Sequence, residues 1–446
     1  MPGRRTSDNI TLVQEVNRTL KTRRGGTGYV ALKLDLEKAY NRLDWAFLQE
    51  SLEFFQLPPN LITLIMNMVS STRFHILWNG SPPPEVVPTR GVRRGDPLLP
   101  YLFILCLERL SIHLKEAIRD KLLHPMSFQG RIRISHLFFT DDIFLFTIAT
   151  ARDCRQLNTI LQTFCASSRQ TMSATKSPIW FSPHIPRCIK DQVVGIFGIP
   201  TTDRIGTYLE TPIFTTHRTT NSYQYLVDKI QKRIEGWQAK FLSMASQATF
   251  IKATVASIPI YAMQTTLPPQ KISHQIDKRS YKFLWGDTTS RRSCHTVNWE
   301  TVTLPKEAGG LGIPSTSHRN RAILINQAWH LHANTNMLWA QVLKAKYFPH
   351  TTFLANTRLT RGSHIWHSLS LGLILLLTGM SWIVGDGQTI RIWKDQWLPR
   401  GSLRGYIEGP ISIQDENQQV SSLRAHHFWT FEALNFPLSS LLLNLI

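Results

Sequence analysis

The stretch HLFFTDDIFLF, residues 136–146, decides the fold, because two apolar runs enclose the adjacent carboxylates Asp141 and Asp142. Apolar runs on either side of a short polar pair predict two strands joined by a tight turn. Taken alone, an Asp-Asp pair is more often a solvated turn. Between such apolar strands, however, two like charges repel each other and destabilise the turn unless a cation lies beside them. The stretch therefore predicts a β-hairpin that presents two carboxylates to a cation.

A third carboxylate lies upstream in KLDLEKAY, residues 33–40, where Asp35 ends a strand predicted from Tyr29 to Leu36. Taken alone, Asp35 would fit equally well as the N-cap of a helix. Beside the Asp141–Asp142 pair it completes a set of hard oxygen ligands, the kind that holds Mg²⁺ together with substrate phosphates. Two ions held in this way lower the pKa of an attacking 3′-hydroxyl and neutralise charge on a leaving pyrophosphate.

A basic loop that runs into a helix follows in RGVRRGDPLLPYLF, residues 90–103. Asp96 followed by proline predicts an N-cap and a first helical turn, and residues 98–118 behind it predict a largely buried helix. On its own this motif is only a helix start. Further helices are predicted over residues 7–20, 44–55 and 223–241, the last with an apolar stripe and a basic flank, and a hairpin is predicted over residues 74–88.

The composition indicates a large basic protein with more than one domain. A chain of 446 residues is too long for one ordinary core, so two or three domains are expected. Residues 1–150 hold 19 basic and 14 acidic side chains and residues 151–446 hold 31 and 16, so the second part carries +15 of the net +20. Such a surplus favours polyanions, nucleic acid before acidic lipid, although charge alone leaves a merely basic protein open.

Other features argue against several classes of protein. The five cysteines form no CxxC pair and no regular spacing, which argues against zinc ribbons and disulfide frameworks and fits a reducing compartment. His330 with His332, and His364 with His367, lack Cys or acidic partners at ligand spacing, so we interpret them as surface or core histidines. The longest apolar run, residues 371–377, is too short to cross a bilayer, and no signal peptide opens the chain. We therefore expect a protein of the nucleus and cytoplasm.

Together these motifs resemble the reverse transcriptases of plant LINE-type (non-LTR) retrotransposons, whose motifs run KxDLxKAYDxxxW, RGxRQGDPLSPYLF and HLxFADDxxLF. The resemblance continues through TKSPIWFSP (residues 175–183), through Tyr208-Leu209, which match the primer-grip region, and through residues 233–261, which match the thumb. KEAGGLGI, LWAQVLKAKYFP and GDGQTIRIWKDQWLP resemble the extension that precedes a zinc-binding segment in these proteins. Nearly the whole chain is covered.

The resemblance implies an α+β fold built as a right-hand polymerase. An antiparallel palm sheet backed by helices is expected, with partial fingers, a helical thumb and a mainly helical C-terminal extension. The implied domains are residues 1–185 (partial fingers and palm), 186–290 (thumb and connection) and 291–446 (basic C-terminal extension). Because the first residues match the FVPGR motif of the family, we expect an N-terminally truncated chain, and we expect the zinc-binding region itself to be absent.

The resemblance also implies the residues of a polymerase site. Asp35, Asp141 and Asp142 match the metal-binding carboxylates, with Asp35 and Asp141 preferred as direct ligands of Mg²⁺ or of Mn²⁺ as its substitute. Lys176 matches a lysine proposed to protonate the leaving pyrophosphate. Tyr40 matches the aromatic residue under the incoming sugar, where a bulky ring clashes with a 2′-hydroxyl. The loop that contacts the nucleotide and template is matched by Arg93, Arg94, Gly95 and Asp96.

The implied partners are dNTPs, an RNA template and a DNA primer, and the oligomeric state stays open. The sequence departs from the family pattern at Asn41 (for aspartate), Arg94 (glutamine), Leu99 (serine), Thr140 (alanine), Glu210-Thr211 (Gly-Val) and residues 373–377. With the expected loss of most of the fingers, these changes predict weak or absent polymerase activity. RNA-templated DNA synthesis is the leading interpretation; its rivals are a catalytically degenerate nucleic-acid-binding remnant and a pseudogene product with no selected role.

Overall fold

The computed structural model describes residues 5–23, 27–73, 79, 85–92, 95–203, 205–213, 220–235, 242–287, 293–354, 362–398, 402–406, 409–425, 428–430 and 434. The chain divides into two compact units, Met1–Leu369 and Ser370–Ile446. The domain boundaries expected at residues 185 and 290 stay predictions.

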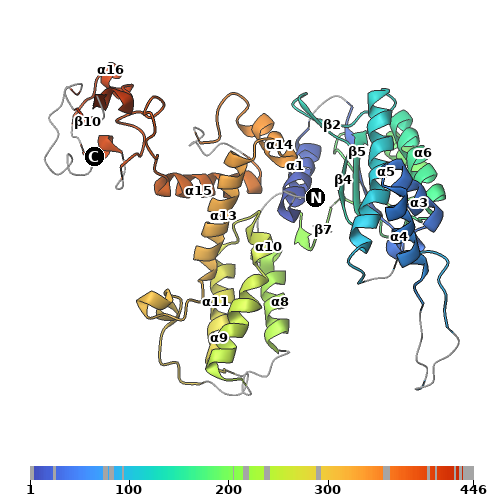
Figure 1. Cartoon of the computed structure of the whole chain (residues 1–446), viewed down its shortest axis with the longest axis horizontal. Helices are drawn as coiled ribbons and strands as arrows, with labels where there is room; N and C mark the ends of the chain where they lie inside the picture. Colours follow the sequence, from blue (N-terminus) through green and yellow to red (C-terminus); the bar gives the residue numbers. More distant parts are fainter. Residues whose placement is uncertain are drawn as a thin grey trace. The chain divides into compact units, whose positions relative to one another are not determined.

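A four-stranded antiparallel sheet organises the N-terminal half of the first unit (Figure 1). Its order is β4 (His136–Phe139), β5 (Asp142–Ile148), β1 (Tyr29–Asp35) and β6 (Ile179–Phe181). The two strands predicted around the Asp-Asp pair and the strand predicted from Tyr29 are therefore confirmed. Because side chains alternate along a strand, Leu32 and Leu34 of β1 point to one side of the sheet, and Lys33 and Asp35 to the other.

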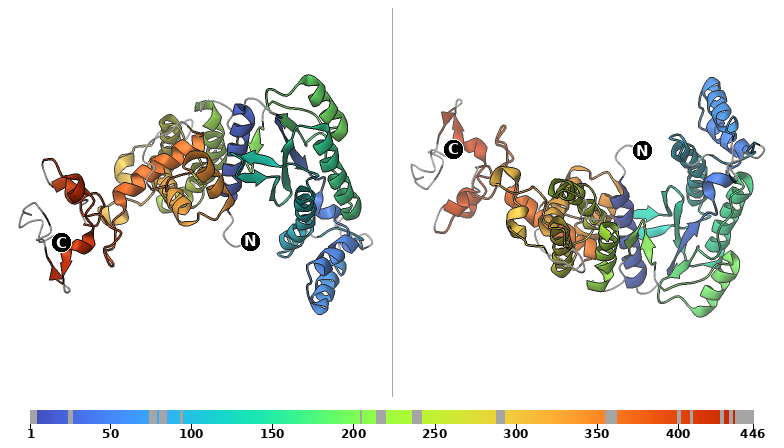
Figure 2. Two further views of the ribbon diagram at one scale, coloured as in Figure 1. Left: turned by 90° about the horizontal axis from the view of Figure 1, so that it is seen from above. Right: turned by 90° about the horizontal axis from the view of Figure 1, so that it is seen from below.

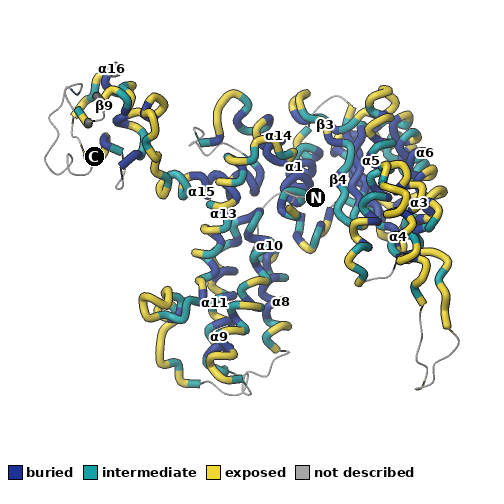
Figure 3. Tube along the Cα trace, viewed as in Figure 1, coloured by how far each residue is buried: buried dark blue, intermediate teal, exposed yellow. Residues whose placement is uncertain are grey.

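Three helices cover one face of this sheet: α3 (Trp45–Phe54), α5 (Leu99–Arg119) and α6 (Ala151–Ser168). They bury a single apolar core with Leu32, Leu34, Ile143 and Leu145 of the strands. The predicted N-cap of α3 is confirmed, since the Asp44 carboxylate accepts hydrogen bonds from two backbone N–H groups of the first turn. Figure 3 shows the buried residues concentrated in the strands and in the helix sides that face them. The protein is thus α+β, an antiparallel sheet backed by helices as expected for a palm.

The other face of the sheet carries an aromatic cluster. Phe144 of β5 stacks on Trp180 of β6 (ring centroids 5.9 Å apart) and meets the edge of Tyr208 at 4.9 Å. Tyr208 belongs to a short hairpin of β7 (Thr207–Tyr208) and β8 (Thr211–Pro212). Helix α1 (Thr6–Thr22) lies beside the strands on the side away from α6 (Figure 2). One face of the sheet is therefore covered by α3, α5 and α6. The opposite face, which carries the aromatic cluster and the β7–β8 hairpin, is called the open face below.

A group of helices follows the hairpin along the chain and forms its own apolar core. It contains α8 (Gln224–Glu235), α9 (Met244–Ala253), α10 (Ile260–Met263), α11 (Gln270–Leu284) and α12 (Trp299–Val302), and α13 (Thr316–Ala333) packs against α10 and α11. Leu226 and Ile230 of α8 are buried, whereas Lys229, Lys232 and Arg233 are exposed, so the predicted apolar stripe and basic flank are confirmed over the described part of this helix. Residues 236–241 lie outside the described residues. The chain then returns through α14 (Leu338–Tyr347) to pack against α1.

The remaining elements of the first unit are α2 (Ala39–Arg42), α4 (Pro59–Ser70), β2 (Met126–Phe128), β3 (Ile132–Ile134) and α7 (Arg187–Phe197). Helix α15 (His364–Gly379) begins at the end of this unit. The second unit has a small core of its own, built around Trp393 and Trp397, with α16 (Ile413–Glu416), β9 (Arg424–Ala425) and β10 (Phe428–Trp429). All five cysteines are free. Among the described residues no helix is both long and apolar enough to cross a membrane.

Two predicted helix starts were displaced. The first helix begins at Thr6, and Arg5 rather than Ser7 is its N-cap. Helix α5 begins at Leu99 with Leu98 as its N-cap, so the predicted cap at Asp96 was too early. Residues 74–78 and 80–84 of the predicted hairpin lie outside the described residues.

Candidate active site

The pairing of β1 with β5 places Asp35 directly opposite Asp142 at the end of the ladder. Residues opposed in this way have Cα atoms about 4.5–5.5 Å apart and side chains on the same face of the sheet. Two hydrogen bonds fix the backbone of Asp35: its N–H donates to Ser177 Oγ (3.0 Å), and its carbonyl accepts from the N–H of Ser173 (2.9 Å). The side chains of Asp35 and Asp142 are 38% and 26% exposed, so solvent reaches both.

Asp141 lies in the two-residue turn between β4 and β5, and its side chain is exposed. Thr140, the other turn residue, has a left-handed φ of 49°, which is unusual for a β-branched residue. Its hydroxyl contacts the carbonyl of Phe139 at 2.8 Å and Oδ1 of Asp141 at 2.9 Å. The structure thus opposes Asp35 to Asp142 across two strands and places Asp141 on the adjoining turn.

Two lysines lie beside the opposed carboxylates. Lys33 Nζ is 3.1 Å from Asp142 Oδ1, and Lys176 Nζ is 4.0 Å from Asp35 Oδ2. The sequence analysis proposed Lys176 but missed Lys33. The signal was present, because Lys33 is two residues before Asp35 on the same strand and therefore shares its face. These ammonium groups balance part of the negative charge that the two carboxylates bring together.

The donor set fits a hard divalent cation by its chemistry, since carboxylate oxygens are the ligands that Mg²⁺ prefers. The arrangement is incomplete, however. Within the parts of the chain that the structure describes, no group of three or more His, Cys, Asp or Glu side chains is gathered as a metal site. Asp35 and Asp142 come from facing strands, and Asp141 Oδ1 is engaged by Thr140. The fit therefore rests on the opposed pair, with Asp141 one residue away.

Tyr40 lies beside a loop whose residues Gly91 and Val92 make three hydrogen bonds to the segment from Tyr40 to Trp45. The ring of Tyr40 packs on Phe103 of α5 at 4.9 Å, and its carbonyl accepts from the N–H of Val92 (2.9 Å). Gly91 donates to the carbonyl of Leu43 (2.8 Å) and accepts from the indole N–H of Trp45 (2.8 Å). The backbone of Gly91 has a φ of 83°, and a Cβ there would lie 2.5 Å from a backbone oxygen. Only glycine allows this close approach.

Of the other residues predicted to contact the nucleotide, Gly95 and Asp96 are among the described residues. Gly95 has a φ of 93°, and Asp96 Oδ1 accepts from the N–H of Leu98 (2.9 Å). Asp96 therefore closes a local turn in front of α5, because the Pro97-Leu98 segment precedes the helix instead of opening it. Arg93 and Arg94 lie outside the described residues.

The β7–β8 hairpin, which resembles the primer grip, touches the strand that carries Asp142. Tyr208 is fully buried, and burial, followed by the nearby charge of Asp142, raises the pKa of its hydroxyl. Leu209 and Glu210 form the turn with φ values of 47° and 58°. Positive φ at both positions is typical of a type I′ turn, which favours glycine or asparagine. Glu210 stands where the resemblance implies glycine, so this turn carries strain.

We expect Glu210→Gly to stabilise the hairpin relative to Glu210→Ala. Both changes remove the exposed Glu210–Lys229 ion pair (2.6 Å), but only glycine relieves the left-handed backbone. The gain is about 1 kcal/mol after allowing for the entropy of glycine in the unfolded chain. Amide hydrogen exchange over residues 207–213 should therefore be about fivefold slower in the glycine variant. Equal exchange in the two variants would show that the turn is unstrained.

Comparison with known proteins adds evidence that is independent of this geometry. A family model described as "Reverse transcriptase (RNA-dependent DNA polymerase)" matches residues 1–241. An Arabidopsis thaliana protein named as a ribonuclease H protein is 37% identical to this chain over 183 residues. These residues are 40% of this chain and 29% of that protein.

Two further relatives belong to mobile elements. A 149 kDa transposon protein of Xenopus laevis is 24% identical over 365 residues, 78% of this chain and 26% of its own length. A retrovirus-related Pol polyprotein of a type-2 retrotransposable element from Drosophila melanogaster is 30% identical over 146 residues, 33% of this chain and 13% of the polyprotein. The matched regions span less than a third of each of these three relatives.

Proposed function

Because this chain belongs to the reverse transcriptase (RNA-dependent DNA polymerase) family, we propose that it copies an RNA template into DNA for a plant non-LTR retrotransposon of the LINE type. The observation that carries the proposal is the register that opposes Asp35 to Asp142 on the open face of the sheet. We infer that the 3′ end of a primer and a dNTP meet at these carboxylates. Similarity to proteins of mobile elements supports the retrotransposon origin.

The residues of the site have distinct proposed roles. Asp35 and Asp142, with Asp141, hold Mg²⁺ or Mn²⁺, which when bound supplies charge neutralisation and activates the attacking hydroxyl. Lys33 orients Asp142 through its 3.1 Å contact. Lys176, which is 74% exposed, can reach the leaving pyrophosphate and give it a proton.

Nucleotide selection is assigned to Tyr40 and the loop above it. The ring packs on Phe103 and the backbone carbonyl of Tyr40 is bonded to Val92, and these contacts are proposed to hold the ring where it meets a ribose 2′-hydroxyl. Gly95, Asp96, Arg93 and Arg94 belong to the same loop in sequence and are proposed to contact nucleotide and template. The proposed partners are dNTPs, an RNA template and a DNA primer, and the proposed location is the nucleus and cytoplasm.

A second candidate is a nucleic-acid-binding protein without catalysis. Two observations favour it: Lys33 already pairs with Asp142, and the chain after residue 150 carries +15. Both candidates predict binding to a primer–template that weakens steeply as salt rises, because basic side chains release counterions from the phosphates. Gel-shift affinity between low and moderate salt therefore tests nucleic-acid binding but does not separate the candidates.

Extension of an oligo(dT) primer on poly(rA) by the purified chain separates them. We expect Mg²⁺-dependent incorporation of dTTP, with UTP excluded by Tyr40. Incorporation should be slow, because Arg94 adds a fixed charge where the resemblance implies a neutral amide. Salt-sensitive binding without any incorporation would contradict the polymerase and support the second candidate.

A further inference from the structure

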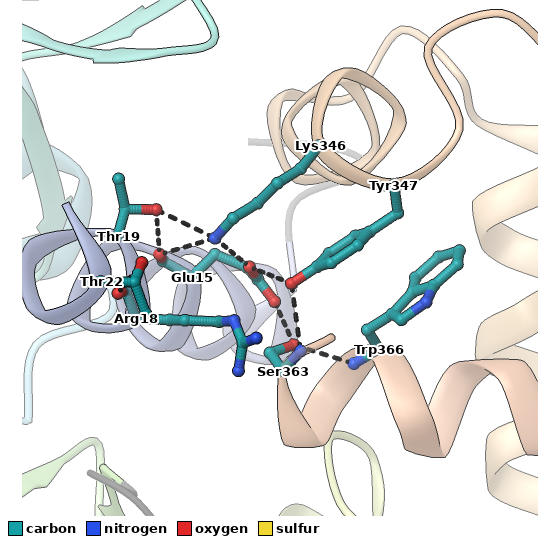
Figure 4. A network of polar contacts seen from close by, with 8 residues as sticks. All are labelled: Glu15, Arg18, Thr19, Thr22, Lys346, Tyr347, Ser363 and Trp366. Carbon is teal, nitrogen blue, oxygen red and sulfur yellow. Dashed lines mark hydrogen bonds and ion pairs between the residues drawn. The ribbon is translucent and has the colours of Figure 1, made fainter. Parts of the chain in front are cut away.

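Helix α1 carries a carboxylate that is removed from solvent. Glu15 has an exposed fraction of 0%, and its side chain is surrounded by groups from a distant part of the chain (Figure 4). Lys346 Nζ lies 2.6 Å from Glu15 Oε2, the Tyr347 hydroxyl donates to the same oxygen at 2.8 Å, and the Ser363 hydroxyl donates to Oε1. Both oxygens of this carboxylate are therefore satisfied by residues that are distant in the sequence.

Lys346 is equally well satisfied. Its ammonium also donates to Thr19 Oγ1 at 2.9 Å and to the carbonyl of Glu15 at 3.2 Å, which accounts for all three N–H donors. Burial lowers the pKa of Lys346, and the charge of Glu15 opposes that shift. The ring of Tyr347 stacks on Trp366 at 4.5 Å, which ties the first turn of α15 to the same cluster. This cluster of Glu15, Thr19, Lys346, Tyr347 and Ser363 is called the α1 knot below.

The same helix makes one contact to the edge strand β4 of the sheet and one to the separate β7–β8 hairpin. The amide of Asn9 donates to the carbonyl of Phe138 on β4 (3.4 Å), close to the turn that holds Asp141. The amide of Gln14 donates to the carbonyl of Pro212 on β8 (3.1 Å), in the hairpin that resembles the primer grip. Gln14 and Glu15 are adjacent, so a shift of α1 at the knot is carried directly to that hairpin.

A buried ion pair adds little to the free energy of unfolding. Apolar side chains of similar volume often stabilise a core as well or better, because they avoid desolvating two charges. The ion pair instead adds directional contacts, because the hydrogen bonds of Lys346 join α14 to Glu15 and Thr19 of α1. The family model ends at residue 241, whereas Lys346, Tyr347 and Ser363 lie beyond it. The knot thus joins a segment outside the family match to a helix inside it.

We propose that Glu15 and Lys346 are positioning residues that hold α1, and through Asn9 and Gln14 the β4–β5 and β7–β8 hairpins, in the arrangement used for synthesis. Helix α14 and the residues at the start of α15 then take part in synthesis. The role in synthesis rests on the proposed function, whereas the mechanical coupling of the knot to the two hairpins does not.

The test compares three variants of the full chain by amide hydrogen exchange and thermal unfolding. Lys346→Met leaves the Glu15 charge buried without its partner. Glu15→Gln combined with Lys346→Met removes both charges and keeps the volumes similar. Asn320→Ala is the matched control, because Asn320 is a buried amide that donates to the carbonyls of Met263 and Thr266 in the helical group.

We expect Lys346→Met to speed exchange of residues 136–142 and 207–213 by about fivefold or more, the lower end of the usual range for coupling between sites. The double variant should recover most of the melting temperature but not the protection of the two hairpins, because the three hydrogen bonds from Lys346 to α1 are still missing. Asn320→Ala should lower the melting temperature and leave both hairpins unchanged.

Unchanged exchange in both hairpins of the double variant, or an equal rise in Asn320→Ala, would overturn the proposal, and the double variant decides it even where Lys346→Met fails to fold. Primer extension by the double variant gives a second readout. A positioning role predicts a higher KM for primer–template in this variant, although its melting temperature stays close to that of the native chain. If the native chain proves inactive, the polymerase proposal fails while the exchange result still decides the coupling.

Discussion

Replacing Asp142 with asparagine is expected to lower the rate of primer extension by at least on the order of 10²–10³-fold, the loss typical of removing one preorganised electrostatic group. The asparagine side chain would keep the shape of the native one and the β1–β5 register but remove the charge opposite Asp35. Affinity for the primer–template should change little, because binding depends on basic side chains spread over the chain. Single-turnover extension with dTTP measures the rate separately from binding.

Asp120→Asn is the matched control for this variant. Asp120 is an exposed aspartate just after α5 whose ion pair with Arg119 lies on the surface, so its loss should leave extension unchanged. A rate for Asp142→Asn that stays within about threefold of the native rate, smaller than any single essential group contributes, would exclude Asp142 from the chemistry.

Gly91→Ala is expected to destabilise the first unit by about 2–5 kcal/mol. Left-handed backbone costs a residue with a Cβ about 1–2 kcal/mol, and forcing an extra carbon into a packed site costs about 1–3 kcal/mol more. The added carbon would lie 2.5 Å from the carbonyl oxygen of Asn41, and backbone atoms cannot move aside as a side chain can. The loop that holds Tyr40 through Val92 should therefore shift, and the KM for dNTP should rise.

Gly130→Ala separates the cost of the left-handed backbone from the cost of the close contact. Gly130 also has a positive φ, 71°, but nothing lies within 4 Å of its would-be Cβ, so only the backbone strain applies. Calorimetry should show a clearly smaller loss for Gly130→Ala than for Gly91→Ala, and an unchanged KM for dNTP. Equal losses in both variants would show that the close approach at Gly91 contributes nothing.

Local signals in the sequence were sufficient for three strands, β1, β4 and β5, and for the helices α1, α3, α5 and α8. The apolar runs around Asp141-Asp142 predicted β4 and β5, and Asp44 predicted the start of α3, because alternation and capping are properties of neighbouring residues. The pairing of β1 with β5 could not be predicted from neighbouring residues. Its register depends on contacts between residues far apart in the chain, so the sequence predicted that Asp35 and Asp142 converge only through the chemistry of a shared cation.

The α1 knot shows where such reasoning ended. A glutamate on an amphipathic helix is normally solvated, and nothing near Glu15 in the sequence indicates burial. Its partners lie in α14 and just before α15, so only the tertiary structure identifies them. The strained turn at Leu209-Glu210 was hidden for the opposite reason, because the glycine that normally marks a type I′ turn is absent from it.

The central claim is that Asp35 and Asp142, with Asp141, form one divalent-metal site, and binding of Mn²⁺ tests it most directly. Electron paramagnetic resonance counts free Mn²⁺ in the presence of a primer–template, without requiring turnover. The account predicts that the native chain and Asp120→Asn bind Mn²⁺, that Mg²⁺ displaces it, and that the double variant Asp35→Asn with Asp142→Asn loses this binding. Equal Mn²⁺ binding by all three proteins would contradict the account.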